Sequence, residues 1–181
     1  MFLLGNSYLG CGRAEAALEV LKAASARERN HPAIASSLAQ ALFDLGRFAE
    51  AEVSFRKSVR LDSKSPFAQV GLANALAMQG KLGEAETLLK RVVSRFPDAP
   101  FGWLNLGNVA RDQARLEEAA GHYQRALLCD PHLAEAHNNL GSALHGLFRF
   151  EEAEREYRAC LDLAPGHRSE EHTSELQSHS F

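Results

Sequence analysis

The side chains of this chain that could do chemistry are three cysteines, eight histidines and a set of asparagines. One cysteine has acid–base groups close by, because Cys129, Asp130 and His132 follow an apolar stretch with helical spacing. A thiol beside an imidazole and a carboxylate is an arrangement used in nucleophilic catalysis. The Asp-Pro pair inside this cluster is, however, typical of a turn between helices. We therefore interpret the cluster as a turn with Cys129 directed to the core.

Other catalytic and cofactor-binding patterns are missing from the sequence. It has no glycine-rich phosphate loop, no paired-cysteine zinc spacing, no nucleophile elbow and no His-Glu-x-x-His. Histidines and glutamates gather only in the last residues, which we interpret as an accidental cluster. His122, His137 and His145 lack carboxylates at i+4, which favours a solvated position for each. We expect no catalytic residue, no metal and no cofactor.

The composition of the chain indicates which classes of partner and which cellular compartment to expect. The net charge is −3 and charged residues make up 24% of the chain, so no basic surface points to nucleic acid. No apolar run approaches the length of a membrane span, so we expect no membrane partner. The cysteine count is odd and shows no paired spacing, which favours reduced thiols and a cytoplasmic location.

A repeat of 34 residues runs from the first residue to His167. In each copy a leucine is followed by glycine or alanine, and later an alanine precedes a large side chain by four residues. These positions are Leu4, Leu38, Leu72, Leu106 and Leu140; Ala17, Ala51, Ala85, Ala119 and Ala153; and Leu21, Phe55, Leu89, Tyr123 and Tyr157. Apolar residues within each copy have helical spacing on both sides of a central break, which predicts two helices per copy.

The ends of these helices carry recognisable signals. Glycine stands at the break in the first three copies, as Gly12, Gly46 and Gly80, whereas Ala114 and Phe148 stand there in the last two. Asp98 precedes Pro100 and is expected to cap the helix that follows. Glutamates dominate the first turns of the second helices and basic residues their later turns, which suits the helix dipole. We interpret this charged surface as a solvated outer face.

The pattern resembles the tetratricopeptide repeat family, whose unit is a helix–turn–helix of 34 residues. The fourth copy matches best, with Trp103-Leu104-Asn105-Leu106-Gly107, Ala119, Tyr123, Ala126 and Asp130-Pro131. The resemblance implies an all-α, right-handed superhelix of about ten antiparallel helices. It divides the chain into copies 1–31, 32–65, 66–99, 100–133 and 134–167.

The resemblance also implies a binding surface, because first helices in this family line a concave groove that holds an extended peptide. Amides there can bond a peptide backbone whatever its sequence. The groove residues that we predict on this chain are Gln40, Phe43, Asn74, Met78, Asn105, Asn108, Arg111, Asn138, Asn139 and His145. Further positions mapped to it include Phe2, Asn6, Leu9, Ser36, Ser37, Phe67, Val70 and Phe101. Asn105 with Asn139, and Asn74 with Asn108, resemble part of the asparagine ladder of the O-linked N-acetylglucosamine transferase family.

These features support three functional hypotheses. The first is a non-catalytic scaffold that binds a protein or peptide segment in the groove. The alternative is the substrate-recognition arm of a larger bacterial glycosyltransferase or sulfotransferase, with its catalytic domain absent from this fragment. A third is weak self-association through uncapped end repeats.

The repeat register ends at His167. The stretch from Arg168 to Ser178 resembles the translation of a common short-read sequencing adapter. We therefore expect residues 168–181 to be a non-native, disordered tail with no part in the function, and the natural protein to continue past His167.

Overall fold

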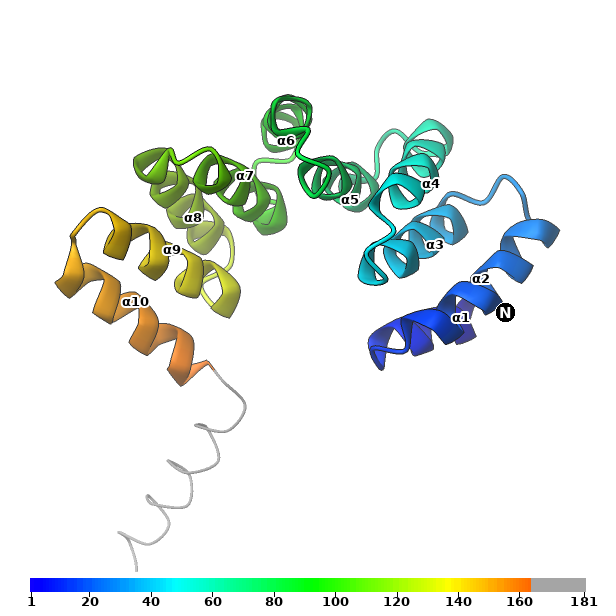
Figure 1. Cartoon of the computed structure of the whole chain (residues 1–181), viewed down its shortest axis with the longest axis horizontal. Coiled ribbons are helices and arrows are strands. Elements are labelled where there is room, and N and C mark those ends of the chain that lie inside the picture. Colours follow the sequence, from blue (N-terminus) through cyan, green and yellow to red (C-terminus); the bar gives the residue numbers. More distant parts are fainter. Residues whose placement is uncertain (164–181) are drawn as a thin grey trace, which may run out of the picture. The chain divides into compact units, whose positions relative to one another are not determined.

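The computed structural model describes residues 1–163 and contains, over these residues, ten α-helices and no strand (Figure 1). The expected all-α fold is confirmed. The helices are α1 (Phe2–Gly10), α2 (Ala14–Arg27), α3 (Pro32–Asp44), α4 (Phe48–Leu61), α5 (Pro66–Ala77), α6 (Leu82–Arg95), α7 (Pro100–Asp112), α8 (Leu116–Cys129), α9 (Ala134–Gly146) and α10 (Phe150–Asp162). The expectations for residues 168–181 lie outside the described part of the chain.

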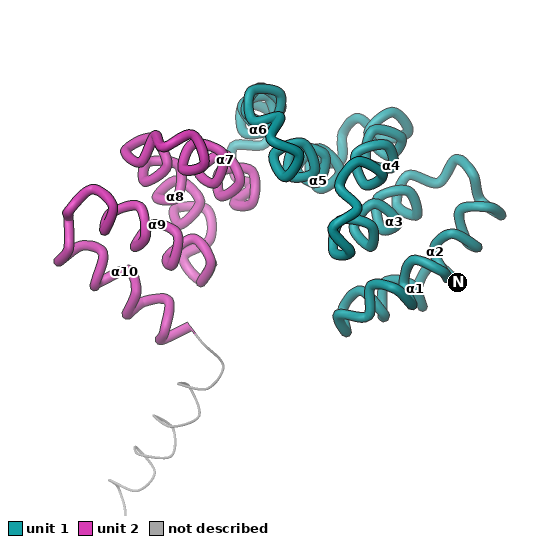
Figure 2. The backbone as a smooth tube through the Cα atoms, viewed as in Figure 1, with its two compact units in different colours: residues 1–97 teal, residues 98–181 magenta. Residues whose placement is uncertain are grey.

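The helices belong to two compact units, coloured separately in Figure 2. The first unit is Met1–Pro97 and holds α1 to α6, and the second begins at Asp98 and holds α7 to α10. Within each unit every helix packs on the next one along the chain. The odd-numbered helices also pack on one another, α1 with α3, α3 with α5, and α7 with α9. Among the described residues of either unit, no two even-numbered helices bring their Cα atoms within 8 Å of each other.

All five helix pairs turn in the same way. Gly12, Gly46 and Gly80 have φ between 68° and 77°, and Ala114 and Phe148 adopt nearly the same conformation at 60° and 61°. In each turn the next residue donates its backbone N–H to a carbonyl five residues back, as Lys81 does to Leu76 at 3.0 Å and Arg115 to Ala110 at 2.9 Å. The hairpin therefore imposes a left-handed residue even where a side chain makes it costly, by about 1–2 kcal/mol.

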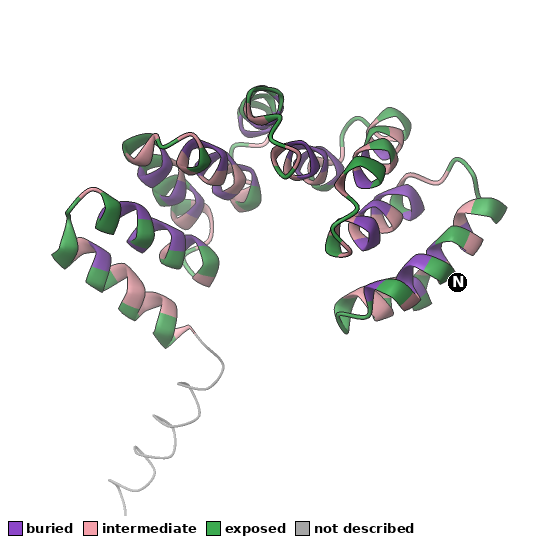
Figure 3. Cartoon of the chain, viewed as in Figure 1, coloured by how far each residue is buried: buried purple, intermediate pink, exposed green. Residues whose placement is uncertain are grey.

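In three of the five pairs a glycine of the first helix faces a large side chain of the second helix. A Cβ added at Gly107 would lie 2.5 Å from the ring of Tyr123, and one at Gly141 would lie 2.8 Å from the ring of Tyr157. Gly5 has the same relation to Leu21. Tyr123 and Leu21 are fully buried. Figure 3 colours the buried parts of the helices purple. The missing side chains therefore let the two helices approach until the large side chain lies against backbone.

Burial is greatest in four of the odd-numbered helices, α3, α5, α7 and α9. α5 is buried along most of its length, from Ala68 to Leu76, because α3, α4 and α6 all pack on it. By contrast α1 buries only Gly5, and α10 buries only Ala153. Leu3 on α1 and Phe148 beside α10 are about four-fifths exposed.

Helix starts differ in their capping. Ser65 Oγ accepts a hydrogen bond from the N–H of Ala68 at 3.4 Å, and His31 Nδ1 accepts one from Ile34 at 3.4 Å. The expectation that Asp98 caps α7 is wrong, because the cap position is Ala99 and no side chain bonds the first turn. Proline at the first position of α7 already removes one of the N–H groups that need a partner. Within residues 1–163, none of the helices combines the length and apolar content that crossing a bilayer requires.

The small-to-large contact gives a direct test. Gly107→Ala should destabilise the second unit by about 1–3 kcal/mol, because the new methyl group overlaps the buried Tyr123 ring. The matched control is Gly121→Ala on α8, where a Cβ meets nothing within 4 Å and should add about 0.5–1 kcal/mol of stability. Chemical denaturation followed by circular dichroism measures both. Equal effects of the two substitutions would contradict the close-packing explanation.

Candidate functional site

A cavity of about 520 Å³ lies on the odd-numbered helices of the first unit. Its volume falls within the range of ligand pockets, about 300–1,000 Å³. α1 and α3 form most of its wall, and the end of α4 and the start of α5 complete it. The lining residues are Phe2, Asn6, Leu9, Pro32, Ala33, Ser36, Ser37, Gln40, Ser58, Asp62, Ser65 and Phe67.

One buried hydroxyl in the lining of this cavity has no partner. Ser36 is only 6% exposed, and its Oγ makes no hydrogen bond to any described residue. The neighbouring Ser58 differs, because its Oγ donates to the carbonyl of Pro32 at 2.9 Å. An unsatisfied buried polar group costs about 1–3 kcal/mol, so it is uncommon without a reason. A ligand group that reached Ser36 Oγ, which is closed to solvent in the free chain, would remove this cost.

Apart from Asp62, the rest of the lining is apolar or uncharged. Phe2 stacks at a tilt on His31 with ring centroids 5.7 Å apart, and Phe67 is 58% exposed. Gln40 Nε2 donates to Asp44 Oδ1 at 2.7 Å, which leaves the Gln40 side-chain oxygen for another partner. Asp62 is the only charged residue in the lining.

The four predicted groove residues of the first unit lie on α3 and on or near α5. Gln40 lines the cavity, whereas Phe43 packs edge-on against Phe48 with centroids 5.2 Å apart. Asn74 is half-buried on α5, and Met78, just beyond α5, is 57% exposed.

The cavity also uses Ser58, Asp62 and Ser65, which sequence reasoning did not include. They come from the end of a second helix and the loop after it. Ser58 and Asp62 stand in register with Ala126 and Asp130 of the fourth copy, where the repeat pattern indicates helix packing and a turn, so the sequence offered no reason to place them in a binding site.

In the second unit, two of the predicted groove asparagines bond each other. Asn139 Nδ2 donates to Asn108 Oδ1 at 3.0 Å, and the Tyr123 hydroxyl donates to the same oxygen at 2.8 Å. These bonds join α7, α8 and α9. Asn139 is buried. The amides of Asn108 and Asn139 therefore hold the helices together, a role that the ladder interpretation did not foresee.

Burial raises the pKa of the Tyr123 hydroxyl from 10.0 to about 12. The neutral phenol is the form that the folded chain holds, because a buried phenolate would lose its hydration. This contribution to stability is complete below pH 10. It is lost as the pH rises towards 12, because the unfolded chain releases the proton first.

The remaining predicted groove residues lie nearer the solvent. Asn105 Nδ2 donates to the carbonyl of Phe101 at 2.8 Å on its own helix, and Arg111 bonds Asp112. Asn138 is exposed and donates weakly to Asn139 at 3.4 Å. His145 packs edge-on against Phe150, with centroids 5.3 Å apart.

His137 and the cluster of Cys129, Asp130 and His132 both make contacts that stabilise the fold. His137 is not simply solvated as expected, because its Nδ1 lies 2.7 Å from Glu156 Oε2 on the next helix and its Nε2 lies 3.1 Å from the carbonyl of Pro131. In the cluster at the end of α8, Asp130 Oδ1 accepts the backbone N–H of His132 at 3.0 Å. A side-chain oxygen that bonds the backbone N–H two residues later is typical of a turn. No three potential metal ligands gather anywhere within residues 1–163.

The helix pairs and their repeat match a known family. Profiles described as tetratricopeptide repeat match residues 2–66, 42–102 and 134–167, and one described as TPR repeat matches residues 107–147. The chain belongs to the tetratricopeptide repeat family. Tetratricopeptide proteins generally act as non-catalytic scaffolds and bind protein or peptide partners. No curated protein matches the chain.

Solved tetratricopeptide structures share the fold. TTC0263, a TPR protein from Thermus thermophilus, is 21% identical with a TM-score of 0.84, over 97% of each chain. MamA is 22% identical with a TM-score of 0.70, over 94% of this chain and 96% of its own. YrrB, described as a TPR protein with an unusual peptide-binding site, is 19% identical with a TM-score of 0.61, over 94% of this chain and 88% of its own. At these identities the likeness concerns the fold alone.

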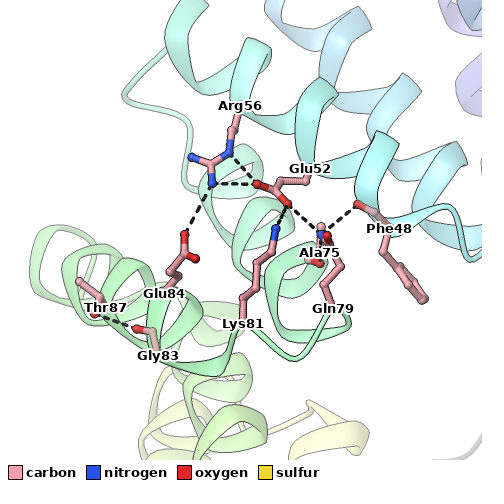
Figure 4. A network of polar contacts seen from close by, with 9 residues as sticks. All are labelled: Phe48, Glu52, Arg56, Ala75, Gln79, Lys81, Gly83, Glu84 and Thr87. Atoms are coloured by element: carbon pink, nitrogen blue, oxygen red, sulfur yellow. Dashed lines mark hydrogen bonds and ion pairs between the residues drawn. The ribbon is translucent and has the colours of Figure 1, made fainter.

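In this tetratricopeptide chain a charged network joins α4 to the turn between α5 and α6 (Figure 4). Glu52 Oε2 accepts from Lys81 Nζ at 2.8 Å and from Gln79 Nε2 at 2.9 Å, while Oε1 accepts from Arg56 at 2.8 Å. The Glu52 side chain is only 12% exposed. The hydrogen bond from Lys81, followed by those from Gln79 and Arg56, lowers the pKa of Glu52 from 4.5 to about 2.

The Glu52 network predicts an acid-dependent stability. Glu52→Gln should destabilise the chain at neutral pH by about 1–3 kcal/mol, because the charged hydrogen bonds are lost. The difference should shrink as the pH falls from 4.5 towards 2, because Glu52 then becomes protonated in the folded chain as well as in the unfolded one. Denaturation at a series of pH values measures it. The control, Glu19→Gln, removes an exposed i,i+3 pair and should change little; a difference that persists undiminished at pH 2 would contradict the assignment.

The asparagine network makes a separate prediction. Asn108→Ala should cost about 1–3 kcal/mol, because the buried Tyr123 hydroxyl and the Asn139 amide lose their shared acceptor. Asn105→Ala is the control, since Asn105 bonds only its own helix and should be nearly neutral. Urea denaturation measures both variants. Equal stability of the two variants would remove the structural role of Asn108.

Proposed function

We infer that this tetratricopeptide chain is a scaffold that holds an extended peptide segment against its first helices. The observation that carries the proposal is the cavity on α1, α3 and α5 with the unpartnered, buried Ser36 hydroxyl in its lining. A peptide backbone presents a carbonyl or N–H at every residue. Such a segment would therefore give Ser36 the partner that the free chain lacks.

The lining suits a backbone-directed mode of binding. Asn6 and Ser37 also make no side-chain hydrogen bond to a described residue, so they can each bond a peptide amide. Phe2, Leu9 and Phe67 offer apolar contact to the side chains of the segment. Each hydrogen bond contributes about 0.5–1.5 kcal/mol net, so useful affinity requires several of them together with the apolar contacts.

The charge of the cavity lining limits the kind of peptide that can bind. No lysine or arginine lines the cavity, and Asp62 is its one charged residue. A terminal carboxylate would have no cation to pair with. We therefore favour an internal peptide segment that is neutral or basic near Asp62, which can pair with a lysine or arginine of the partner.

The second unit, taken by itself, offers a peptide the groove residues that internal bonds leave most accessible. The side-chain oxygen of Asn105 makes no hydrogen bond to a described residue, and Asn138 and His145 are exposed. Asn108 and Asn139 contribute mainly by fixing α7 and α9, on which these residues lie.

Ser36→Ala tests the proposal. Peptides are first selected from a random library on the full chain, and their affinities are then compared by calorimetry. The substitution should weaken binding about two- to tenfold, since one hydrogen bond is lost. It should leave the free energy of unfolding unchanged or slightly raised, because the hydroxyl has no partner in the free chain.

Ser54→Ala is the matched control, because Ser54 lies half-buried on α4 outside the cavity. It should leave peptide affinity unchanged. If the selected peptides bind wild type, Ser36→Ala and Phe67→Ala equally well, the cavity on the first helices is excluded as their site.

A further inference from the structure

A second groove lies in the first unit, between the second helices α4 and α6. Its volume is about 440 Å³. The backbones of α4 and α6 do not approach each other closely, which leaves a space between them. α5 packs on both helices and forms the floor of this space. The lining residues are Val53, Arg56, Val59, Arg60, Leu72, Leu76, Glu84, Leu88 and Arg91. The sequence led us to interpret this side of the chain as a solvated, charged outer face. Between α4 and α6 that interpretation is incomplete, because aliphatic side chains line a groove there.

The floor of this α4–α6 groove is aliphatic. Leu72 and Leu76, one turn apart on α5, are at least nine-tenths buried, and so is Leu88 of α6. Val53 of α4 stands at the edge and is 67% exposed. The apolar side chains thus run from the core to an open rim, where a partner's aliphatic side chain could cover them.

The rim carries more positive than negative charge. Its residues on α4 are Val53, Arg56 and Arg60, which share one face at i, i+3 and i+7. Its residues on α6 are Glu84 and Arg91, which share one face at i and i+7. Arg56 bonds Glu52 and lies 3.7 Å from Glu84 (Figure 4).

Arg60 and Arg91 differ from Arg56. Neither has a carboxylate within 4.0 Å among the described residues, although the chain as a whole has net charge −3. Two cations without carboxylate partners, beside the exposed Val53 and a largely buried aliphatic floor, are therefore the distinctive feature of this groove.

We propose that the α4–α6 groove docks an acidic peptide segment of a partner protein, with a leucine-like side chain on the aliphatic floor and flanking carboxylates on Arg60 and Arg91. Arginine binds carboxylates through two parallel hydrogen bonds, which would fix the direction of the segment. The aliphatic floor favours protein over nucleic acid, because no aromatic side chain in the lining offers a base a stacking surface. This surface is separate from the cavity on α1, α3 and α5, whose lining shares no residue with it.

The test uses the full chain and a defined probe. The probe is an acetylated and amidated peptide, Glu-Asp-Leu-Glu-Leu-Asp-Glu, titrated to millimolar concentration while amide NMR shifts are followed. Two control peptides replace its leucines by serine or its acids by lysine. We expect binding of the first peptide alone, shifts centred on α4 to α6, and weakening as salt rises.

The variants remove the two unpaired charges. Arg60→Ala with Arg91→Ala should weaken binding about three- to thirtyfold, the range for two exposed ion pairs. Val53→Glu should abolish it by repelling the acidic probe, and its exposure makes the substitution compatible with folding. The matched control, Arg27→Ala with Lys64→Ala, removes two exposed charges elsewhere in the same unit and should leave binding unchanged.

Several results would overturn the proposal. The first is that the probe peptide does not bind at millimolar concentration. The second is that the serine peptide or a single-stranded oligonucleotide binds as tightly as the probe. The third is that the variant with Arg60→Ala and Arg91→Ala binds the probe with unchanged affinity. Self-association that Val53→Glu abolishes, measured by light scattering, would assign the groove to a second copy of the chain and not to an acidic partner. Circular dichroism confirms that each variant is folded before its affinity is interpreted.

Discussion

The contact between a small residue of one helix and a ring or leucine of its partner is the constraint on which the rest of the fold depends. Gly107 against Tyr123 and Gly141 against Tyr157 leave no room for even one added methyl group. A close approach of this kind also joins neighbouring pairs, because Gly71 of α5 lies against the Phe55 ring of α4. The left-handed turn residue is part of the same requirement, since Ala114 and Phe148 accept a strained backbone to keep the hairpin closed.

This packing makes the two sides of the first unit chemically different. The first helices pack on one another, whereas the backbones of α4 and α6 stand apart with α5 between them. One side therefore offers a cavity with neutral hydroxyls and amides, and the other offers an aliphatic groove edged by arginines. A chain with no catalytic pattern can still present two distinct surfaces, because helix packing places different side chains on each side.

The asparagines show where sequence reasoning was incomplete. Their spacing along the repeat was visible, and so was the capacity of an amide to bond a peptide. The bond from Asn139 to Asn108, and the Tyr123 hydroxyl that shares the same oxygen, were not visible, because they join residues from three helices. The contact between His137 and Glu156 was not predicted for the same reason, because the two residues lie on different helices and not one turn apart on the same helix.

The sequence by itself determined the ten helices, their order and the positions of the turns, because hydrophobic spacing and turn residues act locally and recur in every copy. The resemblance to the repeat family also predicted which helix face would bind a peptide, through Ser36, Gln40 and their neighbours. Only the tertiary structure decided which polar groups are already bonded, which one is left buried without a partner, and where a groove opens between second helices. Those properties depend on distances between helices, and the repeat pattern does not encode such distances.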